Sequence, residues 1–171
     1  MAPSAPDSVR LLPGDSFADA RGRFATPWES RHTPFFVPES AHFSHNAAPG
    51  TLRGLHYQAE PYAQSKLVHC VSGRVFDVTV DLRPDSPGFK TWRAFELSAE
   101  RPEALWIPAG FAHGFLTLEG GTILGYLIAG PYRPYQARGI RWDDPTFRIE
   151  WPATPALLIS DKDRSFPDFQ T

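Results

Sequence analysis

The run "KLVHCVSGRVFDVTVDLR", Lys66–Arg83, decides the fold, because it alternates side chains in the way that β-strands do. Successive residues of a strand point to opposite faces of its sheet. One face therefore carries Phe76, Val78, Val80 and Leu82, and the other carries Val75, Asp77, Thr79 and Asp81. Ser72 and Gly73 interrupt the run with turn residues, which predicts a hairpin between two strands.

Short strands are also predicted on the C-terminal side of this run. "RPDSPG" (83–88) has the residues of a turn, and "TWRAFEL" (91–97) resumes the alternation. Three more short apolar runs follow: "ALWIP" (104–108), "GFLTL" (114–118) and "TILGYLI" (122–128). No long stretch has a helical period. The pattern predicts an all-β protein, a jelly-roll sandwich or barrel with few short helices.

The chain of 171 residues is predicted to form one domain, 1–171. Residues 1–13 and 166–171 are expected to be loose tails. The first forty residues are less regular than the rest, and we expect them to pack at a sheet edge or on a partner subunit. The segment "ISDKDRSFPDF" (159–169) is polar and is expected to be irregular.

Composition excludes several classes of function. The formal net charge is -2 and no block of like charges occurs, so a nucleic-acid surface is not expected. A ligand with a few phosphates needs only two or three local cations. Cys70 is the single cysteine, which excludes a disulfide framework. No apolar run is long enough to predict a membrane span or a signal peptide, so we expect a cytoplasmic protein.

Three polar side chains in apolar surroundings are candidates for chemistry: Arg53, His56 and Lys66. Each also has an ordinary interpretation. Arg53 could form an ion pair, His56 could be a core or surface histidine, and Lys66 could lie along apolar neighbours with its ammonium in water. A barrel brings distant strands around one interior, so these residues could converge with others.

Four more candidates lie further along the chain. His113 could cap a turn, Asp163 could be a solvated loop residue, and Tyr126 and Tyr132 could be core or rim aromatics. A metal site is not expected, because no H-x-H occurs among the six histidines and such sites usually need three or four His or carboxylate ligands. No cofactor is predicted.

Several longer stretches carry a family resemblance. They are "RGLHYQ" (53–58) with Lys66 ten residues after its histidine, "DARGRF" (19–24), "VFDVTVDLRPDSP" (75–87), "LWIPAGFAHGF" (105–115), "RGIRWDDP" (138–145) and "ISDKDR" (159–164). The chain resembles the dTDP-4-dehydrorhamnose 3,5-epimerases over roughly residues 14–165. These are metal-independent cupin-fold enzymes that act on nucleotide-linked 4-keto-6-deoxy sugars.

The resemblance implies a role for each matching residue. His56 matches the catalytic base, Asp163 the carboxylate that orients it, Lys66 the lysine beside the sugar keto oxygen, and Tyr126 the proton donor on the opposite ring face. Tyr132 matches an aromatic that stacks on the nucleotide base.

The resemblance also implies a substrate-binding set and a homodimer. Arg21 and Arg53 match clamps on the diphosphate, and Arg21 would come from the other subunit. The further substrate-binding residues would be Phe24, Asn46, His113 and Lys162. The expected partner is a nucleotide-sugar substrate, with no nucleic acid and no membrane.

This sequence departs from the family pattern at the periphery of the site. The family usually has Glu in place of Thr26, Gln-Asp in place of Ser44 and His45, and an acidic or polar residue near Ala137. The segment between Asn46 and Arg53 is also about three residues shorter.

These departures leave the expected chemistry intact and the substrate open. The chemistry is inversion of C3, C5 or both in a nucleotide-diphospho-4-keto-6-deoxyhexose, through an enolate, in deoxysugar biosynthesis. The alternatives are a monoepimerase on a different nucleotide sugar and a non-catalytic cupin that binds one.

Overall fold

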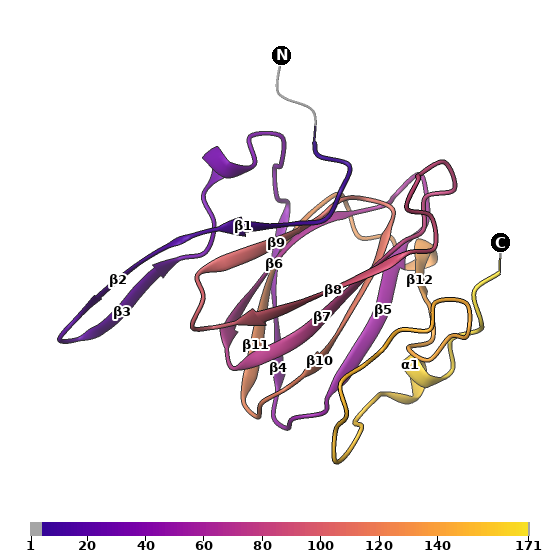
Figure 1. Ribbon diagram of the computed structural model, residues 1–171. Helices are drawn as coiled ribbons and strands as arrows, with labels where there is room; N and C mark the ends of the chain where they lie inside the picture. The colour runs from indigo at the N-terminus through magenta and orange to yellow at the C-terminus, as the bar shows by residue number, and fades with distance from the viewer. Residues whose placement is uncertain (1–4, 171) are drawn as a thin grey trace.

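Two five-stranded antiparallel sheets form a sandwich in the computed structural model of the protein, which describes residues 5–170 (Figure 1). The first sheet has the order β1-β9-β6-β11-β4, and the second has the order β12-β5-β10-β7-β8. The strands of the first sheet are Arg10–Pro13 (β1), Glu103–Ile107 (β9), Ser65–Ser72 (β6), Thr122–Ala129 (β11) and Ser40–Asn46 (β4). Those of the second are Ala137–Gly139 (β12), Leu52–Gln58 (β5), Phe111–Thr117 (β10), Arg74–Asp81 (β7) and Trp92–Ser98 (β8). The all-β sandwich predicted from the sequence is confirmed.

Helical structure is scarce in the described part of the chain. It consists of two 3-10 turns, Ser30–His32 (η1) and Pro134–Gln136 (η2), and one short helix, Asp161–Arg164 (α1). The segment predicted to be irregular thus contains a single helical turn. None of the helices within residues 5–170 has the length and apolar character needed to cross a membrane.

Both faces of β7 are covered, and this explains its alternation. Val75 packs with Leu105, Leu124 and other buried residues in the core between the two sheets. On the other face, Val78 and Val80 belong to a second apolar cluster that includes residues of the segment that follows β12. The face between the sheets also carries Asp77, which is fully buried. That face therefore brings a carboxylate into the interior.

The hairpin predicted at Ser72 and Gly73 is wrong. β6 and β7 lie in different sheets, so Gly73 marks a corner where the chain crosses from one sheet to the other. Gly73 has a φ of 75°, and a Cβ there would lie 2.3 Å from the Thr122 hydroxyl. A turn residue between two alternating runs does not specify whether those runs pair with each other, since both arrangements need the same local chemistry.

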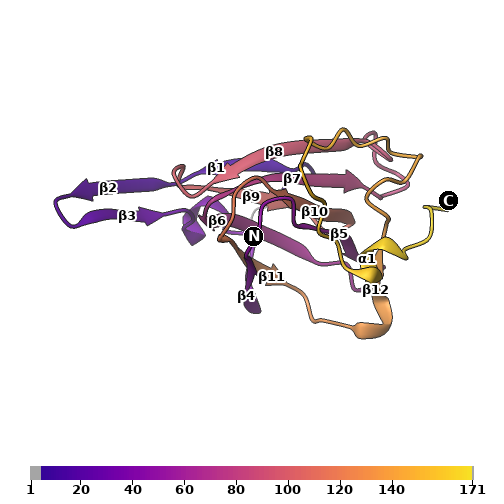
Figure 2. The ribbon, with the colours of Figure 1, turned by 90° about the horizontal axis from the view of Figure 1, so that it is seen from below.

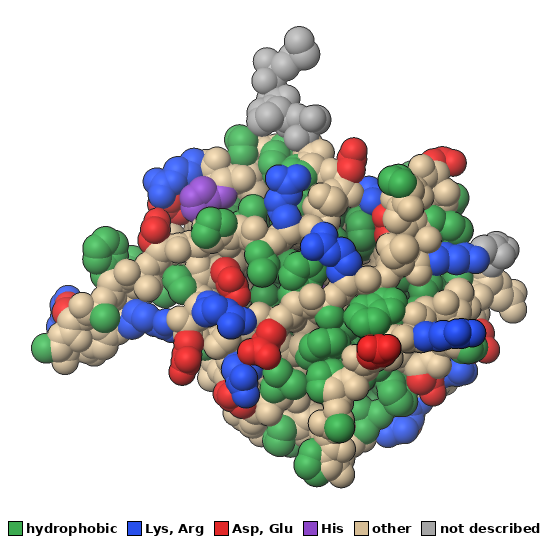
Figure 3. Space-filling view, viewed as in Figure 1, with side chains coloured by type: hydrophobic (Ala, Val, Ile, Leu, Met, Phe, Trp, Pro, Cys, Tyr) green, Lys and Arg blue, Asp and Glu red, His purple; other side chains and the backbone are tan. Residues whose placement is uncertain are grey.

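A long hairpin projects from one end of the sandwich (Figure 2). It consists of β2 (Asp15–Asp19) and β3 (Gly22–Thr26), which pair with each other alone. In the space-filling view the hairpin carries hydrophobic side chains next to charged ones, with little of the body around them (Figure 3). Phe17 and Phe24 are 77% and 73% exposed.

The two segments predicted to be loose tails are mostly ordered against the body. Residues 10–13 form β1 on β9, and Val9 is buried in the core. At the other end, Phe169 packs on the apolar cluster outside β7, and its N–H donates to Asp144. Apolar side chains in both segments explain the error, because burying them against the sandwich stabilises the fold. Residues 1–4 and 171 lie outside the described part.

Candidate active site

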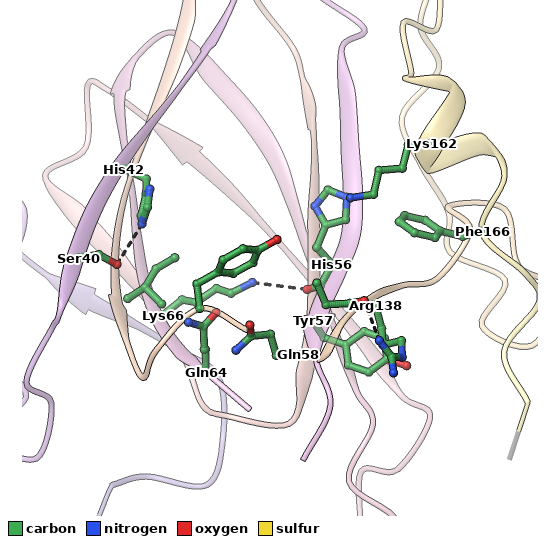
Figure 4. A pocket seen from close by; sticks show the side chains of 13 residues that line it. Ser40, His42, His56, Tyr57, Gln58, Gln64, Lys66, Arg138, Lys162 and Phe166 are labelled. Carbon is green, nitrogen blue, oxygen red and sulfur yellow. Dashed lines mark hydrogen bonds between the residues drawn. The ribbon is translucent and has the colours of Figure 1, made fainter. Parts of the chain in front are cut away.

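A cavity opens between the two sheets at the end where α1 crosses β5 (Figure 4). It consists of two adjoining hollows of about 310 and 410 Å³ that share His42, His56, Lys66 and Ile128 as lining residues. Tyr132 and Lys162 line the first hollow. Arg53, His113 and Tyr126 line the second.

His56 and Asp163 form a hydrogen-bonded pair at the wall of this cavity. His56 Nε2 lies 2.8 Å from Asp163 Oδ1, and the backbone N–H of Gly54 donates to Asp163 Oδ2 over 3.0 Å. The Asp163 side chain is 7% exposed, whereas that of His56 is 45% exposed. The carboxylate is therefore held behind the imidazole, which faces the open space.

Local sequence explains how this pair is built. Ser160 caps α1 by accepting a hydrogen bond from the Asp163 N–H, which fixes the turn that presents the carboxylate. Gly54, two residues before His56, allows β5 to approach β10 closely. A Cβ on Gly54 would lie only 2.5 Å from the Cα of Gly114. The glycines of "RGLH" and "AHGF" thus serve packing, and they let His56 lie opposite His113 in register.

Hydrogen bonding keeps Asp163 ionised. Burial alone would favour the neutral acid, but the bonds from His56 and from Gly54 outweigh it and lower the pKa of Asp163 below its ordinary value. A carboxylate of this kind stabilises a positive charge on the neighbouring imidazole.

Lys66 reaches into the cavity from β6 towards β5 (Figure 4). Its Nζ lies 3.4 Å from the backbone oxygen of His56, and both residues line the two hollows. Burial lowers the pKa of Lys66 to about 8, and the charge of Asp77 opposes this shift. The side chain is thus a cation that the interior has made easier to deprotonate.

Tyr126, on β11, contributes a phenol to the same cavity. Its ring is edge-on to the ring of His113, with centroids 6.1 Å apart. Burial raises the pKa of Tyr126 well above its ordinary value, and the negative charge of Asp77 adds to the shift. The hydroxyl therefore keeps its proton at neutral pH.

Arg53 and Asn46 are in contact, but only one of them lines this cavity. Arg53 Nε donates to Asn46 Oδ1 over 2.8 Å. The amide nitrogen of buried Asn46 is itself used, donating to the backbone oxygens of Ser44 and Thr122. Asn46 therefore holds Arg53 in place, while the guanidinium lines the second hollow.

The outer part of the cavity is formed by Tyr132 and Lys162 with Arg138 and Phe166. Tyr132 is 66% exposed, as a surface for stacking would be. Lys162 and Phe166 approach from the α1 side, next to His56 (Figure 4). Phe166 lies edge-on to the His56 ring at 5.9 Å between centroids.

Arg21 and Phe24 are not part of this cavity in their own chain. Both lie on the projecting hairpin, away from α1 and β5 (Figure 1). Arg21 is paired with Asp19, and its side chain is 90% exposed. If these two residues bind substrate, they reach a site on another subunit.

Sequence reasoning missed three residues: Asp77, Phe166 and His42. His42 and Phe166 line the cavity, and Asp77 is the hydrogen-bond partner of His113. One signal was present for Asp77, because it is a carboxylate in the middle of an apolar strand. Phe166 gave none, since it lies in a stretch that looked like a tail.

The peripheral departures from the family pattern fall around the cavity and the hairpin. Ser44 and His45 line the second hollow and Ala137 lines the first. Thr26 ends β3. Within residues 5–170, no three His, Cys, Asp or Glu side chains are grouped closely enough to hold a metal ion.

Comparison with known proteins places this chain in a family. The model of the dTDP-4-dehydrorhamnose 3,5-epimerase family matches residues 6–171. A dTDP-4-dehydrorhamnose 3,5-epimerase from Sinorhizobium fredii is 42% identical over 163 residues, covering 93% of this chain and 84% of the relative.

Two solved structures are similar in fold over nearly the whole chain. The Bacillus anthracis dTDP-4-dehydrorhamnose 3,5-epimerase, with TDP and PPi bound, superposes with a TM-score of 0.87 at 40% identity and covers 94% of both chains. A 3'-monoepimerase from Streptomyces bikiniensis, in complex with dTDP-quinovose, superposes with a TM-score of 0.87 at 30% identity and covers 98% of this chain and 87% of the other. The chain therefore belongs to the dTDP-4-dehydrorhamnose 3,5-epimerase family, as the resemblance of its motifs predicted.

Proposed function

We propose that the protein epimerises a nucleotide-diphospho-4-keto-6-deoxyhexose of the dTDP-4-dehydro-6-deoxyglucose type at C3 and C5, in deoxysugar biosynthesis. One observation carries the proposal. The His56–Asp163 pair opens onto the same cavity as Lys66 and Tyr126, so a base, a cation and a phenol surround one space.

His56 is the proposed base. A proton on the carbon next to a ketone is removed as the enolate forms, and neutral imidazole can accept it near neutral pH. Asp163 binds one ring nitrogen, which leaves the lone pair of the other nitrogen free to take the proton. The imidazolium that results is stabilised by the Asp163 carboxylate.

Lys66 is the proposed partner of the enolate oxygen. A positioned base contributes roughly 10²–10⁴-fold, which is below the acceleration that enzymes usually reach. A fixed donor at the developing oxyanion contributes about 3–4 kcal/mol more. The Lys66 ammonium is close to His56, so one bound sugar can present its α-proton to the base and its keto oxygen to the cation.

Tyr126 is the proposed acid. Inversion needs a proton delivered to the face opposite the one that lost it. Tyr126 comes from β11 of the first sheet, whereas His56 comes from β5 of the second, so the two can address opposite faces of a ring between the sheets. The phenol gives its proton to the enolate carbon as the ketone re-forms, and solvent restores both groups.

The remaining polar residues suit the nucleotide diphosphate. Lys162 lines the first hollow and Arg53 lines the second, both as cations, and Tyr132 offers an exposed ring for the base. His113 lines the second hollow, where it can contact the sugar.

Arg21 and Phe24 are proposed to complete the neighbouring site of a homodimer. The hairpin that carries them projects beyond its own body, and its phenylalanines are exposed. Exposed aromatic groups of this kind mark a surface that a partner covers. A second copy is the natural partner, since most oligomers are symmetric assemblies of one chain.

The cytoplasm remains the proposed compartment. Cys70 is a free, buried thiol, which suits a reducing environment.

The decisive experiment incubates the protein with dTDP-4-dehydro-6-deoxyglucose in D₂O and follows deuterium at C3 and C5 by NMR. Label at both carbons together with inverted product supports the proposal. No exchange with this or with the UDP, GDP and CDP analogues would favour a protein that only binds nucleotide sugars.

A monoepimerase is the second candidate. The S. bikiniensis 3'-monoepimerase has the same fold, so this architecture accommodates inversion of one centre as well. Ser44, His45 and Ala137, where this chain departs from the family pattern, line the cavity in which the sugar and the nucleotide would lie. Label at a single carbon in the same NMR experiment would identify this activity.

A further inference from the structure

Asp77 is a buried carboxylate beside the proposed chemistry. Its side chain is fully buried on β7, and both of its oxygens accept from His113 Nε2, over 2.9 and 2.8 Å. His113 is itself buried and lines the second hollow. Since a carboxylate in an apolar interior is costly, its presence on a strand next to valines requires a reason.

The titratable and charged groups that line the second hollow come from five other strands. They are His42 and His45 on β4, Arg53 and His56 on β5, Lys66 on β6, His113 on β10 and Tyr126 on β11. Lys66 carries a positive charge, and the negative charge of Asp77 acts on Lys66 and on Tyr126.

Lys66 has no direct carboxylate partner in the part of the chain described, since no Asp or Glu oxygen lies within 4.0 Å of its Nζ. This suits the role proposed for it. A direct ion pair would neutralise the ammonium and occupy the hydrogen bonds that the enolate oxygen needs. A buried ammonium without any negative charge nearby would instead lose its proton.

We propose that Asp77 is a positioning residue that keeps the Lys66 ammonium charged, without contacting it, and orients the His113 imidazole in the second hollow. This inference rests on the proposed function, because it concerns the cation assigned to the enolate. It gives a physical reason for the polar residue on an otherwise apolar strand.

The direction of each effect follows from charge. Burial lowers the pKa of Lys66, and Asp77 acts against that shift. Burial likewise raises the pKa of Asp77, and the positive charges of His113 and Lys66 oppose it. Replacing Asp77 with a neutral side chain removes the attraction, so the Lys66 ammonium should lose its proton at a lower pH.

The test measures the titration of Lys66 directly, without substrate. The chain has three lysines, Lys66, Lys90 and Lys162. Protein labelled with ¹³C-lysine gives one set of ε-carbon signals for each, and Lys66→Met assigns the set of interest. In Asp77→Asn, which keeps the size and an acceptor for His113, we expect the Lys66 midpoint to fall by about one pH unit or more. Lys90 and Lys162 should titrate as before.

Asp81→Asn is the matched control. Asp81 is on the same strand and the same face, is also buried, and is bound to Arg83 and Ser86 away from the cavity. The Asp81→Asn substitution should leave the Lys66 midpoint unchanged. Should Asp77→Asn fail to fold, Asp77→Thr is the second variant. The same face of β7 already holds a buried threonine two residues further along, at Thr79.

An unchanged Lys66 midpoint in a folded Asp77 variant would overturn the inference, and so would an equal shift in Asp81→Asn. Neither result depends on turnover. The failure of this inference can therefore be distinguished from the failure of the proposed epimerase activity, which the D₂O experiment tests with the wild-type protein.

Discussion

Asp163 and His56 are 107 positions apart in the chain, and yet Asp163 Oδ1 lies 2.8 Å from His56 Nε2. A single turn of helix after a long irregular segment brings the carboxylate to β5. Asp163→Asn should keep the shape of the pair and remove its charge. We expect kcat to fall on the order of 10²–10⁴-fold, because the imidazole loses its preferred tautomer and the stabilisation of its charged form.

Thermal unfolding of Asp163→Asn provides the control for this prediction. The amide can still accept from the Gly54 N–H, so the loss in stability should be small compared with the loss in turnover. A variant that turns over at the wild-type rate would remove Asp163 from the mechanism.

His56→Ala should abolish deuterium exchange at every α-carbon and still bind the nucleotide. The base is lost, but Arg53 keeps its hydrogen bond to Asn46 and therefore its place in the cavity. Binding of dTDP, followed by calorimetry, serves as the control. Exchange at a rate near that of the wild type would show that another group removes the proton.

Lys66→Met keeps most of the bulk of the side chain and removes its charge. We expect kcat to fall roughly 10²–10³-fold with a much smaller change in KM, since the enolate charge develops mostly in the transition state. The wild-type protein should also lose kcat/KM as the pH rises through about 8, the pKa of Lys66, because only the protonated form stabilises the enolate. Lys66→Met should lack this alkaline limb, and the same limb in the variant would have to come from another group.

The sequence predicted the sheets well and their pairing poorly. Alternation along Lys66–Arg83 indicated strands, because the period of a strand is a local property. The partner of each strand depends on contacts far along the chain, so the turn residues at Ser72 and Gly73 were equally compatible with a hairpin and with the corner that forms.

The site shows the same division between local and distant information. Motifs identified His56, Lys66, Tyr126 and Asp163 one at a time. Only the fold shows that the first three line one hollow and that Asp163 is bonded to His56. Asp77 was missed because its function depends on which face of β7 is turned inward. Both faces of that strand are buried, and alternation alone does not distinguish them.

Tyr126→Phe should separate exchange from inversion. The ring packing is retained and only the hydroxyl is lost, so folding should be nearly unaffected. His56 can still remove the α-proton, and its imidazolium can return a deuteron to the same face. Starting material should therefore gain deuterium while inverted product forms far more slowly, with C5 the more affected centre. One NMR time course in D₂O measures both, and inversion at the wild-type rate would assign the donor elsewhere, with Tyr132 or a bound water next to be tested.

Arg21→Ala should lower kcat/KM only if the hairpin acts on another subunit, because Arg21 does not reach the cavity of its own chain. We expect a rise in KM larger than the fall in kcat, as for loss of one cation from a diphosphate site. Arg23→Ala is the matched control on the same hairpin, since Arg23 donates to the backbone oxygens of Ala99 and Glu100 in its own chain.

Mixing two impaired variants tests this arrangement between subunits most sharply. The Arg21→Ala subunit cannot supply Arg21 to the neighbouring site, and the His56→Ala subunit lacks the base of its own site. In a mixed dimer, the site that holds an intact His56 receives Arg21 from the His56→Ala subunit and is complete. The partner site lacks both groups. After subunit exchange at equal concentrations, half of the dimers are mixed, so the activity should recover to about a quarter of the wild-type value under conditions where Arg21→Ala alone is slow. Mixtures no more active than the sum of the separate variants would show that the hairpin does not complete a neighbouring site.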